Sequence, residues 1–147
     1  MDPKETTQSL MNAIQRADFE MARSLLTDDF VFSGPIPKPA SGPEWLGVSK
    51  SLKTAFPDLD YQFKIESVNG NVVNITAQLK GTHKGNLDLS AMDMGVIPPT
   101  NKSFVAAREH GKVTVQGDKI KSLANEPTEG AGLMAIIGQL GVKVPMM

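Results

Sequence analysis

The sequence predicts a single α+β domain over residues 1–147: a cone-shaped, curved antiparallel sheet with three N-terminal helices on its concave side and a short C-terminal helical tail. Two observations predict this class. Apolar residues recur at helical spacing up to residue 56 and with a period of two from residue 59 to residue 116. The length of 147 residues is also enough to bury one core without disulfides, and it is short for two domains.

Two consecutive helices are expected at the N-terminus. Asp2 followed by Pro3, with Glu5 three residues after Asp2, is typical of a helix start, and Asp18 can cap a second helix. Helical spacing then predicts one packed side for both helices, made by Leu10, Met11, Ile14, Ala17, Phe19, Ala22, Leu25 and Leu26.

A short strand and a third helix follow. Residues 30–32 read Phe-Val-Phe and predict a short strand, between a turn at residues 27–29 and a proline-rich loop at residues 33–39. The run Ser-Gly-Pro-Glu at residues 41–44 starts the third helix, and Pro57 ends it. The buried stripe of this helix should comprise Trp45, Val48, Leu52 and Phe56.

The second half of the chain predicts long paired strands. The first places Tyr61, Phe63 and Ile65 on one face, and the Asn-Gly pair at residues 69–70 is a strong signal for a tight antiparallel hairpin. The strand after this turn spans residues 71–85. It should carry one inward row, made by Val73, Ile75, Ala77, Leu79, Gly81 and His83.

Two further strands complete the meander. The strand over residues 104–116 places Glu109 in one row with Val105, Ala107, Val113 and Val115. A bulge would instead turn Glu109 outward and bring His110 inward, so the two residues are alternatives for one inward polar position. In the strand over residues 119–125 the apolar residues differ in parity, which also predicts a bulge and leaves the inward face unassigned.

Two apolar segments lack the strand pattern. Residues 86–101 have no sustained period, and we expect a flexible loop beside the open end of the sheet. In this loop Met92 and Met94 form either a soft pocket wall or part of the surface. Residues 130–141 predict a short apolar helix, weakened by glycines, that covers an opening or a partner.

Composition excludes several classes of site and partner. Lys and Arg number 15 against 16 Asp and Glu, for a net charge of -1 and no long run of either sign, so no surface for nucleic acid or for an anionic membrane is expected. The absence of cysteine excludes thiolate catalysis and cysteine-ligated zinc, and two histidines leave few ligand sets for any metal. The N-terminus is polar and lacks the apolar stretch of a signal peptide. We therefore expect a cytoplasmic protein that uses neither a metal nor a cofactor.

Five short motifs follow one another along the chain. They are Ala-Phe-Pro-Asp at residues 55–58, Gly-Thr-His-Lys-Gly at 81–85, Pro-Pro-Thr-Asn-Lys at 98–102, Gly-Asp-Lys-Ile at 117–120 and Gln-Leu-Gly at 139–141. In their order and spacing the chain resembles the SnoaL-like polyketide (ester) cyclases, a branch of the nuclear transport factor two-like superfamily of α+β cones. The resemblance covers most of the chain, and this superfamily hosts both enzymes and binding proteins.

The resemblance implies a chemistry that needs a carboxylic acid. In the cyclases an Asp shortly after the strand that begins Lys-Ile is thought to act as general acid and base for an intramolecular aldol closure, without metal or cofactor. Relatives of this type read Lys-Ile-x-Glu-x-Trp followed closely by Asp, whereas residues 119–126 read Lys-Ile-Lys-Ser-Leu-Ala-Asn-Glu. Glu126 or Glu129 would then replace the missing acid.

The remaining candidates come from the predicted inward faces. His83 ends an apolar row, where an imidazole is either a core residue held by backbone groups or a pocket group that exchanges a proton with Glu109 or His110 across the sheet. Other side chains either line the same pocket or belong to the plain core, namely Trp45, Tyr61, Leu79 and Ala107.

Two functions remain open. The first is a cofactor-independent cyclase, isomerase or lyase that acts on a small hydrophobic carbonyl compound, with His83 and an inward carboxylate moving protons. The second is a non-catalytic domain that binds a small hydrophobic molecule. In either case we expect a homodimer, because the convex face of the sheet and the apolar tail would expose more apolar surface than a monomer usually tolerates.

Overall fold

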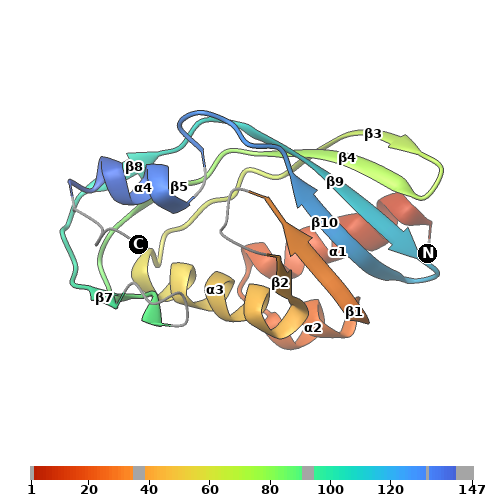
Figure 1. Ribbon diagram of the computed structural model, residues 1–147, viewed down its shortest axis with the longest axis horizontal. Coiled ribbons are helices and arrows are strands. Elements are labelled where there is room, and N and C mark those ends of the chain that lie inside the picture. The colour runs from red at the N-terminus through yellow and green to blue at the C-terminus, as the bar shows by residue number, and fades with distance from the viewer. Residues whose placement is uncertain (1, 35–38, 91–94, 132, 142–147) are drawn as a thin grey trace.

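The computed structural model describes residues 2–34, 39–90, 95–131 and 133–141. Its main sheet consists of six strands: β1 (Leu26–Ser33), β2 (Ala40–Ser41), β3 (Lys64–Asn69), β4 (Val72–Ala77), β9 (Glu109–Gln116) and β10 (Lys119–Asn125). Their order across the sheet is β2-β1-β10-β9-β4-β3 (Figure 1). All neighbours are antiparallel except β1 and β10, which are parallel. The sheet is therefore mixed, and not purely antiparallel as predicted, because β1 lies outside the meander and no hairpin sets its direction.

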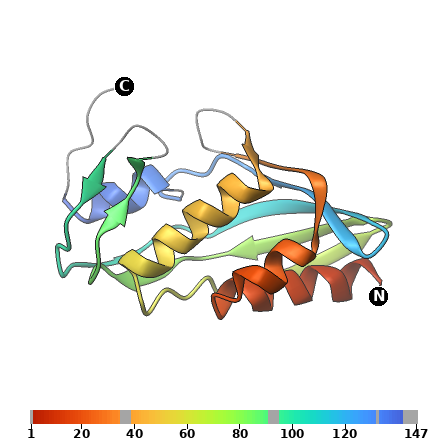
Figure 2. The same ribbon diagram turned by 90° about the horizontal axis from the view of Figure 1, so that it is seen from below.

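Three helices cover one face of this sheet: α1 (Pro3–Gln15), α2 (Phe19–Ser24) and α3 (Gly42–Ala55). Figure 2 shows all three on the same side of the sheet. Each begins where the sequence predicts, because the side chains of Asp2, Asp18 and Ser41 accept a hydrogen bond from a backbone N–H of the first turn. The predicted α+β cone with its helices on the concave side is confirmed. In the described part of the chain no helix is long and apolar enough to span a bilayer.

The core lies between the sheet and the helices. Val73, Ile75 and Ala77 of β4 are buried, as their alternation predicts. In β10 both Ile120 and Leu123 are buried, because the register shifts between Ile120 and Ser122. The predicted bulge is therefore present, and it assigns the inward face of the last strand.

The strand predicted over residues 71–85 is divided in two. β4 ends at Ala77, and β5 (Lys80–Thr82) pairs with β8 (Ser103–Val105) instead of with the main sheet. The segment that leads into β3 bends beside this break, at Gln62, which adopts a positive φ of 49°. Because the interruption spans two residues the parity is kept, and His83 is buried on the inward side, as predicted.

The strand predicted over residues 104–116 is also divided, into β8 and β9. Phe104 and Ala106 are buried, whereas Val105 is 55% exposed, so the prediction that Val105 faces inward is wrong. In β9 the inward residues are again odd-numbered, among them Val113 and Val115. The inward parity therefore changes at the irregular residues 106–108 that separate the two strands.

Two predicted loops contain regular structure. Residues 27–29, predicted as a turn, lie within β1. Residues 86–101 include a short hairpin of β6 (Leu87–Asp88) and β7 (Val96–Ile97), which forms because Leu87 and Ile97 bury their side chains. The candidate wall residues Met92 and Met94 lie outside the described residues, and so does most of the proline-rich loop.

The tail forms the predicted helix, α4 (Leu133–Gln139). It lies beside β8, at the end of the molecule that also holds β5 and β7 (Figure 1). Its Ile136 and Ile137 are buried. The side-chain amide of Gln139 makes two hydrogen bonds to one residue of β8: the Val105 N–H donates to Oε1 at 3.1 Å, and Nε2 donates to the Val105 carbonyl oxygen at 2.8 Å. α4 is thereby fixed along the free side of β8.

Candidate functional site

The sequence leaves Glu109 and His110 as alternatives for one inward position, and the structure selects Glu109. β9 pairs with β4 so that Glu109 lies opposite Ala77, which is buried on the helix-covered face. His110 lies opposite Thr76 and is exposed. Glu109 is therefore the carboxylate that faces the concave side, and the arrangement with His110 inward is not formed.

Glu109 is half-buried. Among the described residues no group forms a hydrogen bond or an ion pair with its carboxylate. Burial raises the pKa of Glu109 above its ordinary value, because the charged form loses contact with water. A carboxyl group whose pKa is moved toward neutrality can accept a proton and return it, which is what general acid–base catalysis requires.

Asn125, the last residue of β10, lies on the same face, although the sequence pattern does not single it out. It pairs with Gly111 of β9, and Glu109 is two residues from Gly111 along that face. A Cβ atom at Gly111 would overlap Asn125 Oδ1, so the carboxamide lies directly over Gly111. The signal that could have found Asn125 is that it lies two residues after the inward Leu123 and so faces the same side. This signal can be used only when the position of the bulge in β10 is known.

Glu126, the predicted replacement for the family's acid, is exposed just beyond β10. Its backbone N–H donates to the His110 carbonyl oxygen at 2.8 Å. Glu129 is exposed as well, so both carboxylates are solvated, unlike that of Glu109. Within the described ranges no three His, Asp or Glu side chains come together in a way that could hold a metal ion.

The predicted wall residues are buried to different degrees. Trp45 is half-buried, and its ring centroid lies 5.4 Å from that of Phe30 and 6.0 Å from that of Phe32. Leu79 and Ala107 are also half-buried. Trp45 and Leu79 pack against the core, and all three side chains keep accessible surface that a ligand on the concave side could cover.

Tyr61 contributes a buried hydroxyl group. Its side chain is 7% exposed, and its ring stacks on Phe63 with centroids 4.9 Å apart. The hydroxyl has no hydrogen-bond partner among the described residues. Burial raises the pKa of Tyr61, so its hydroxyl stays protonated. A buried neutral hydroxyl without a partner is a donor that a ligand could use.

His83 lies in a different environment. It is fully buried, and the Thr100 N–H donates to Nδ1 at 3.2 Å, while Thr100 Oγ1 lies 3.1 Å from the same nitrogen. The imidazole packs against Phe56 with centroids 5.4 Å apart, and Phe56 packs edge-on against Phe104 at 4.8 Å. Because a backbone N–H can only donate, the neutral ring carries its proton on Nε2, which has no partner among the residues described.

The structure does not bring His83 and Glu109 together. Among the described residues Nδ1 of the imidazole contacts Thr100 and Nε2 has no polar partner, so neither ring nitrogen is bonded to the Glu109 carboxylate. The groups next to the imidazole are Thr100 and Phe56, and not the predicted row that includes the exposed Val105. The predicted proton relay between His83 and Glu109 is therefore not formed.

Two of the motifs that carry the resemblance pack against each other beside His83. The Asp58 carboxylate accepts a hydrogen bond from the Thr82 N–H at 2.8 Å, and this bond lowers the pKa of Asp58. The N–H groups of Lys84 and Gly85 both donate to the Ala55 carbonyl oxygen, at 2.9 and 3.0 Å. Residues 55–58 and 81–85 thus form a junction between the end of α3 and β5. These structural contacts explain why the two motifs contain these residues.

Acidification is expected to weaken the fold through His83. Burial lowers the pKa of His83 below its usual 6.5, so folding favours the neutral ring. This contribution to the free energy of unfolding is present above pH 6.5 and is lost as the pH falls through the folded-state pKa. The limiting slope for one proton is about 1.4 kcal/mol per pH unit. Urea unfolding at about pH 7.5 and about pH 5.5 measures the effect.

The two histidines allow a matched comparison. In His83→Asn the amide oxygen can still accept from the Thr100 N–H but does not titrate, so the variant should lose this pH dependence. His110→Asn, on the exposed surface, should keep the dependence of the wild type. A wild-type dependence that persists in His83→Asn would show that another group is responsible.

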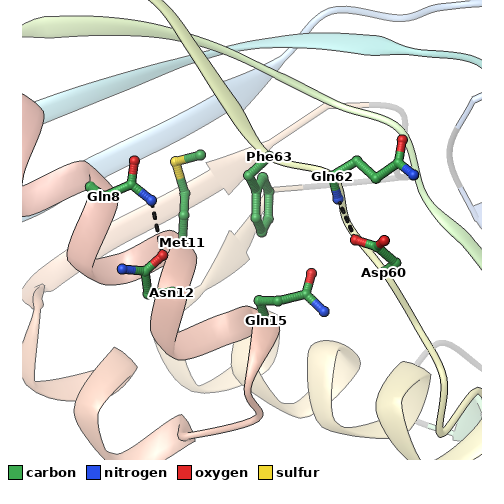
Figure 3. Close-up of a pocket in the computed structure, with 7 residues that line it drawn as sticks. All are labelled: Gln8, Met11, Asn12, Gln15, Asp60, Gln62 and Phe63. Carbon is green, nitrogen blue, oxygen red and sulfur yellow. Dashed lines mark hydrogen bonds between the residues drawn. The ribbon is translucent and has the colours of Figure 1, made fainter.

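A pocket of about 230 Å³ lies between α1 and the segment before β3 (Figure 3). Gln15 connects α1 to the segment before β3: its Nε2 donates to the Leu59 carbonyl oxygen at 3.0 Å, and its Oε1 accepts from the Tyr61 N–H at 2.8 Å. None of the predicted site residues lines the pocket. Its lining consists of Gln8, Met11, Asn12, Gln15, Asp60, Gln62 and Phe63.

Comparison with known proteins gives a family and a fold. The SnoaL-like polyketide cyclase family model matches residues 4–124. IdmH from Streptomyces antibioticus, a proposed polyketide cyclase, is 22% identical over 97% of this chain and 100% of its own, with a TM-score of 0.72. An NTF2-like protein from Burkholderia thailandensis is 15% identical over 97% of this chain and 99% of its own, with a TM-score of 0.70.

A third solved structure has a different described activity. AclR from Streptomyces galilaeus, a proposed hydroxylase, is 18% identical over 95% of each chain, with a TM-score of 0.69. No curated protein sequence gives a significant match. At these identities the solved structures establish the fold, and the chemistry has to be argued from the site itself.

Proposed function

The chain belongs to the SnoaL-like polyketide cyclase family, and from this premise we propose that it binds a small hydrophobic carbonyl compound on the concave face and catalyses acid–base chemistry on it. The reaction class is that of a cofactor-independent cyclase, isomerase or lyase. The observation that carries the proposal is Glu109 on the concave face, a half-buried carboxylate that has no ion-pair partner among the described residues and whose pKa is raised by burial.

The chemistry uses Glu109 in both protonation states. As a carboxylate it removes a proton from the carbon next to the substrate carbonyl, and the electron pair of the broken C–H bond forms an enolate. In a ring closure the enolate carbon attacks a second carbonyl carbon of the same molecule, and the resulting alkoxide takes the proton back from Glu109. Atoms and charge balance without any further reactant.

The remaining groups of the concave face suit a hydrophobic substrate. Trp45, Leu79 and Ala107 supply apolar surface, and the Tyr61 hydroxyl is a protonated donor. Sites for small molecules commonly combine apolar walls with a few placed polar groups. This composition supports a hydrophobic substrate with few charges.

The second candidate is a domain that binds such a molecule without converting it. The observation in its favour is the sequence of residues 119–126, which lacks the Glu, Trp and Asp of the family pattern. The two functions share a ligand class and differ in whether a C–H bond is broken.

Hydrogen–deuterium exchange of α-tetralone separates the two functions. This bicyclic ketone has exchangeable C–H bonds next to its carbonyl, and its proton NMR spectrum in D₂O reports their loss. With the wild-type protein we expect exchange above the buffer rate, saturable in ketone. Saturable binding without exchange would support the binding domain, and an absence of both would contradict each function.

We also propose that the chain forms a homodimer. Val31 and Val105 are 42% and 55% exposed, and they offer apolar surface that a second copy would cover. Light scattering at micromolar concentration should give twice the chain mass of 15.8 kDa. A particle of 15.8 kDa under these conditions would show that the chain is a monomer.

A further inference from the structure

We infer that Asn125 is a second substrate-binding residue of the Glu109 site, whose carboxamide N–H donates to the substrate carbonyl oxygen while Glu109 acts on the adjacent carbon. The inference rests on the proposed function and assigns the group that holds the oxygen.

Two glycines leave open the space that Asn125 occupies. Asn125 pairs with Gly111 of β9, and the preceding Ala124 pairs with Ser33 of β1, which Gly34 follows. A Cβ atom at Gly111 would overlap Asn125 Oδ1, and one at Gly34 would lie 3.2 Å from Asn125 Cβ. A side chain at 111 would therefore push the carboxamide out of its place, and one at 34 would require Asn125 to shift by a few tenths of an ångström.

The backbone does not require glycine at these two positions. The described glycines with a positive φ are Gly70, Gly95, Gly117, Gly130 and Gly141. Other residues could adopt the backbone conformation found at 34 and 111. The missing side chains are instead explained by the room that Asn125 needs on the concave face.

The carboxamide of Asn125 is available to a ligand. It is half-buried, and in the part of the chain that the structure describes it forms no hydrogen bond. A carboxamide offers two N–H donors and an oxygen acceptor, and such groups are usually paired when they are removed from water. A ligand oxygen placed over β9 would supply the missing partner.

The spacing of Asn125 and Glu109 suits one carbonyl unit. The two residues are diagonal neighbours on adjacent strands, a relation with a separation of about 7–8 Å. A donor about 2.9 Å from a carbonyl oxygen and a base about 3–3.5 Å from the adjacent carbon fit across that distance. When the C–H bond breaks, negative charge moves to the oxygen, where a fixed N–H stabilises it.

The experiment observes the carbonyl of bound α-tetralone, labelled with ¹³C at that carbon, by infrared difference spectroscopy. The protein is the full chain with Glu109→Gln, so that binding is seen without proton transfer. A hydrogen bond from Asn125 should lower the carbonyl frequency relative to the double variant Glu109→Gln/Asn125→Leu, in which Leu has a similar shape and no donor. In the exchange assay Asn125→Leu alone should lower the rate by about 100-fold.

Gly111→Ala is a second variant that should abolish the frequency shift, because the added Cβ displaces the carboxamide while Asn125 itself is kept. Loss of the frequency shift in this variant would support the inference even if Asn125→Leu folds poorly. The same carbonyl frequency with and without Asn125 would overturn the inference and leave the proposed function intact, provided that the wild type exchanges α-tetralone. Failure of the wild type to bind α-tetralone would overturn both.

Discussion

Replacing Glu109 with Gln is expected to lower the rate of α-tetralone exchange by about 10²–10⁴-fold, the contribution that a positioned general base typically makes. Glu109 faces the concave side opposite Ala77, and burial raises its pKa. Gln has nearly the same shape but cannot take a proton from carbon. The loss should therefore appear in kcat and not in ketone binding, and NMR measurements of rate and saturation separate the two.

Glu126→Gln is the matched control, because Glu126 is an exposed carboxylate at the end of the neighbouring strand. This variant should exchange α-tetralone at the wild-type rate. The wild-type rate should also rise with pH through the raised pKa of Glu109, since only the carboxylate is a base. Equal losses in both variants, or an unchanged rate in Glu109→Gln, would remove Glu109 from the mechanism.

The same substitution should stabilise the fold at neutral pH. The folded-state pKa of Glu109 is raised above its ordinary 4.5, so folding favours the protonated form. The corresponding stability is present below pH 4.5 and is lost as the pH rises through the folded-state pKa. Above its folded-state pKa, Glu109 carries a partly buried charge that has no ion-pair partner among the described residues, and Gln removes this charge. Such an arrangement is typical of sites that give up stability for activity.

Replacing Phe56 with Ala should cause a large loss of stability, about 3–5 kcal/mol in the free energy of unfolding. Phe56 is fully buried, and its ring contacts those of His83 and Phe104. Its removal would leave a cavity at the junction of α3 and β5. In a domain of this size the loss corresponds to a decrease in Tm of about 10 °C or more, measurable by calorimetry.

The control for Phe56 is Phe19→Ala, which removes the same atoms from a partly buried position on α2. This loss should be clearly smaller, because less apolar surface is removed and water can fill the space. Similar decreases in Tm for the two variants would mean that the junction is not a major source of stability.

Local signals in the sequence specify most of the architecture. Asp2, Asp18 and Ser41 start helices because their side chains bond to nearby backbone groups. Val73, Ile75 and Ala77 are buried as their alternation predicts, whereas Thr76 of the outward row is buried too, with its hydroxyl bonded to the Glu66 and Arg108 side chains. These features depend only on residues close in sequence. The helical and strand periods therefore predict them well.

The candidate site was harder to predict because it depends on where strands break and which segments then pair. The strand breaks for two residues after Ala77, and β5 then pairs with β8 and not with the main sheet. This pairing puts His83 beside Thr100. The choice between Glu109 and His110 depends on the irregular residues 106–108. Asn125 depends on a bulge whose position no local pattern reveals.

The two hydrogen bonds between Gln139 and Val105 have a consequence for the edge of β8. They use the N–H and carbonyl groups with which the edge of β8 could otherwise recruit a strand from another chain. Val105 is also exposed and apolar, so an uncovered edge here would combine free backbone groups with a hydrophobic side chain, a pattern that favours aggregation. The side-chain amide of Gln139 takes the place of a neighbouring strand, so α4 blocks edge-to-edge association at β8 while it remains docked there.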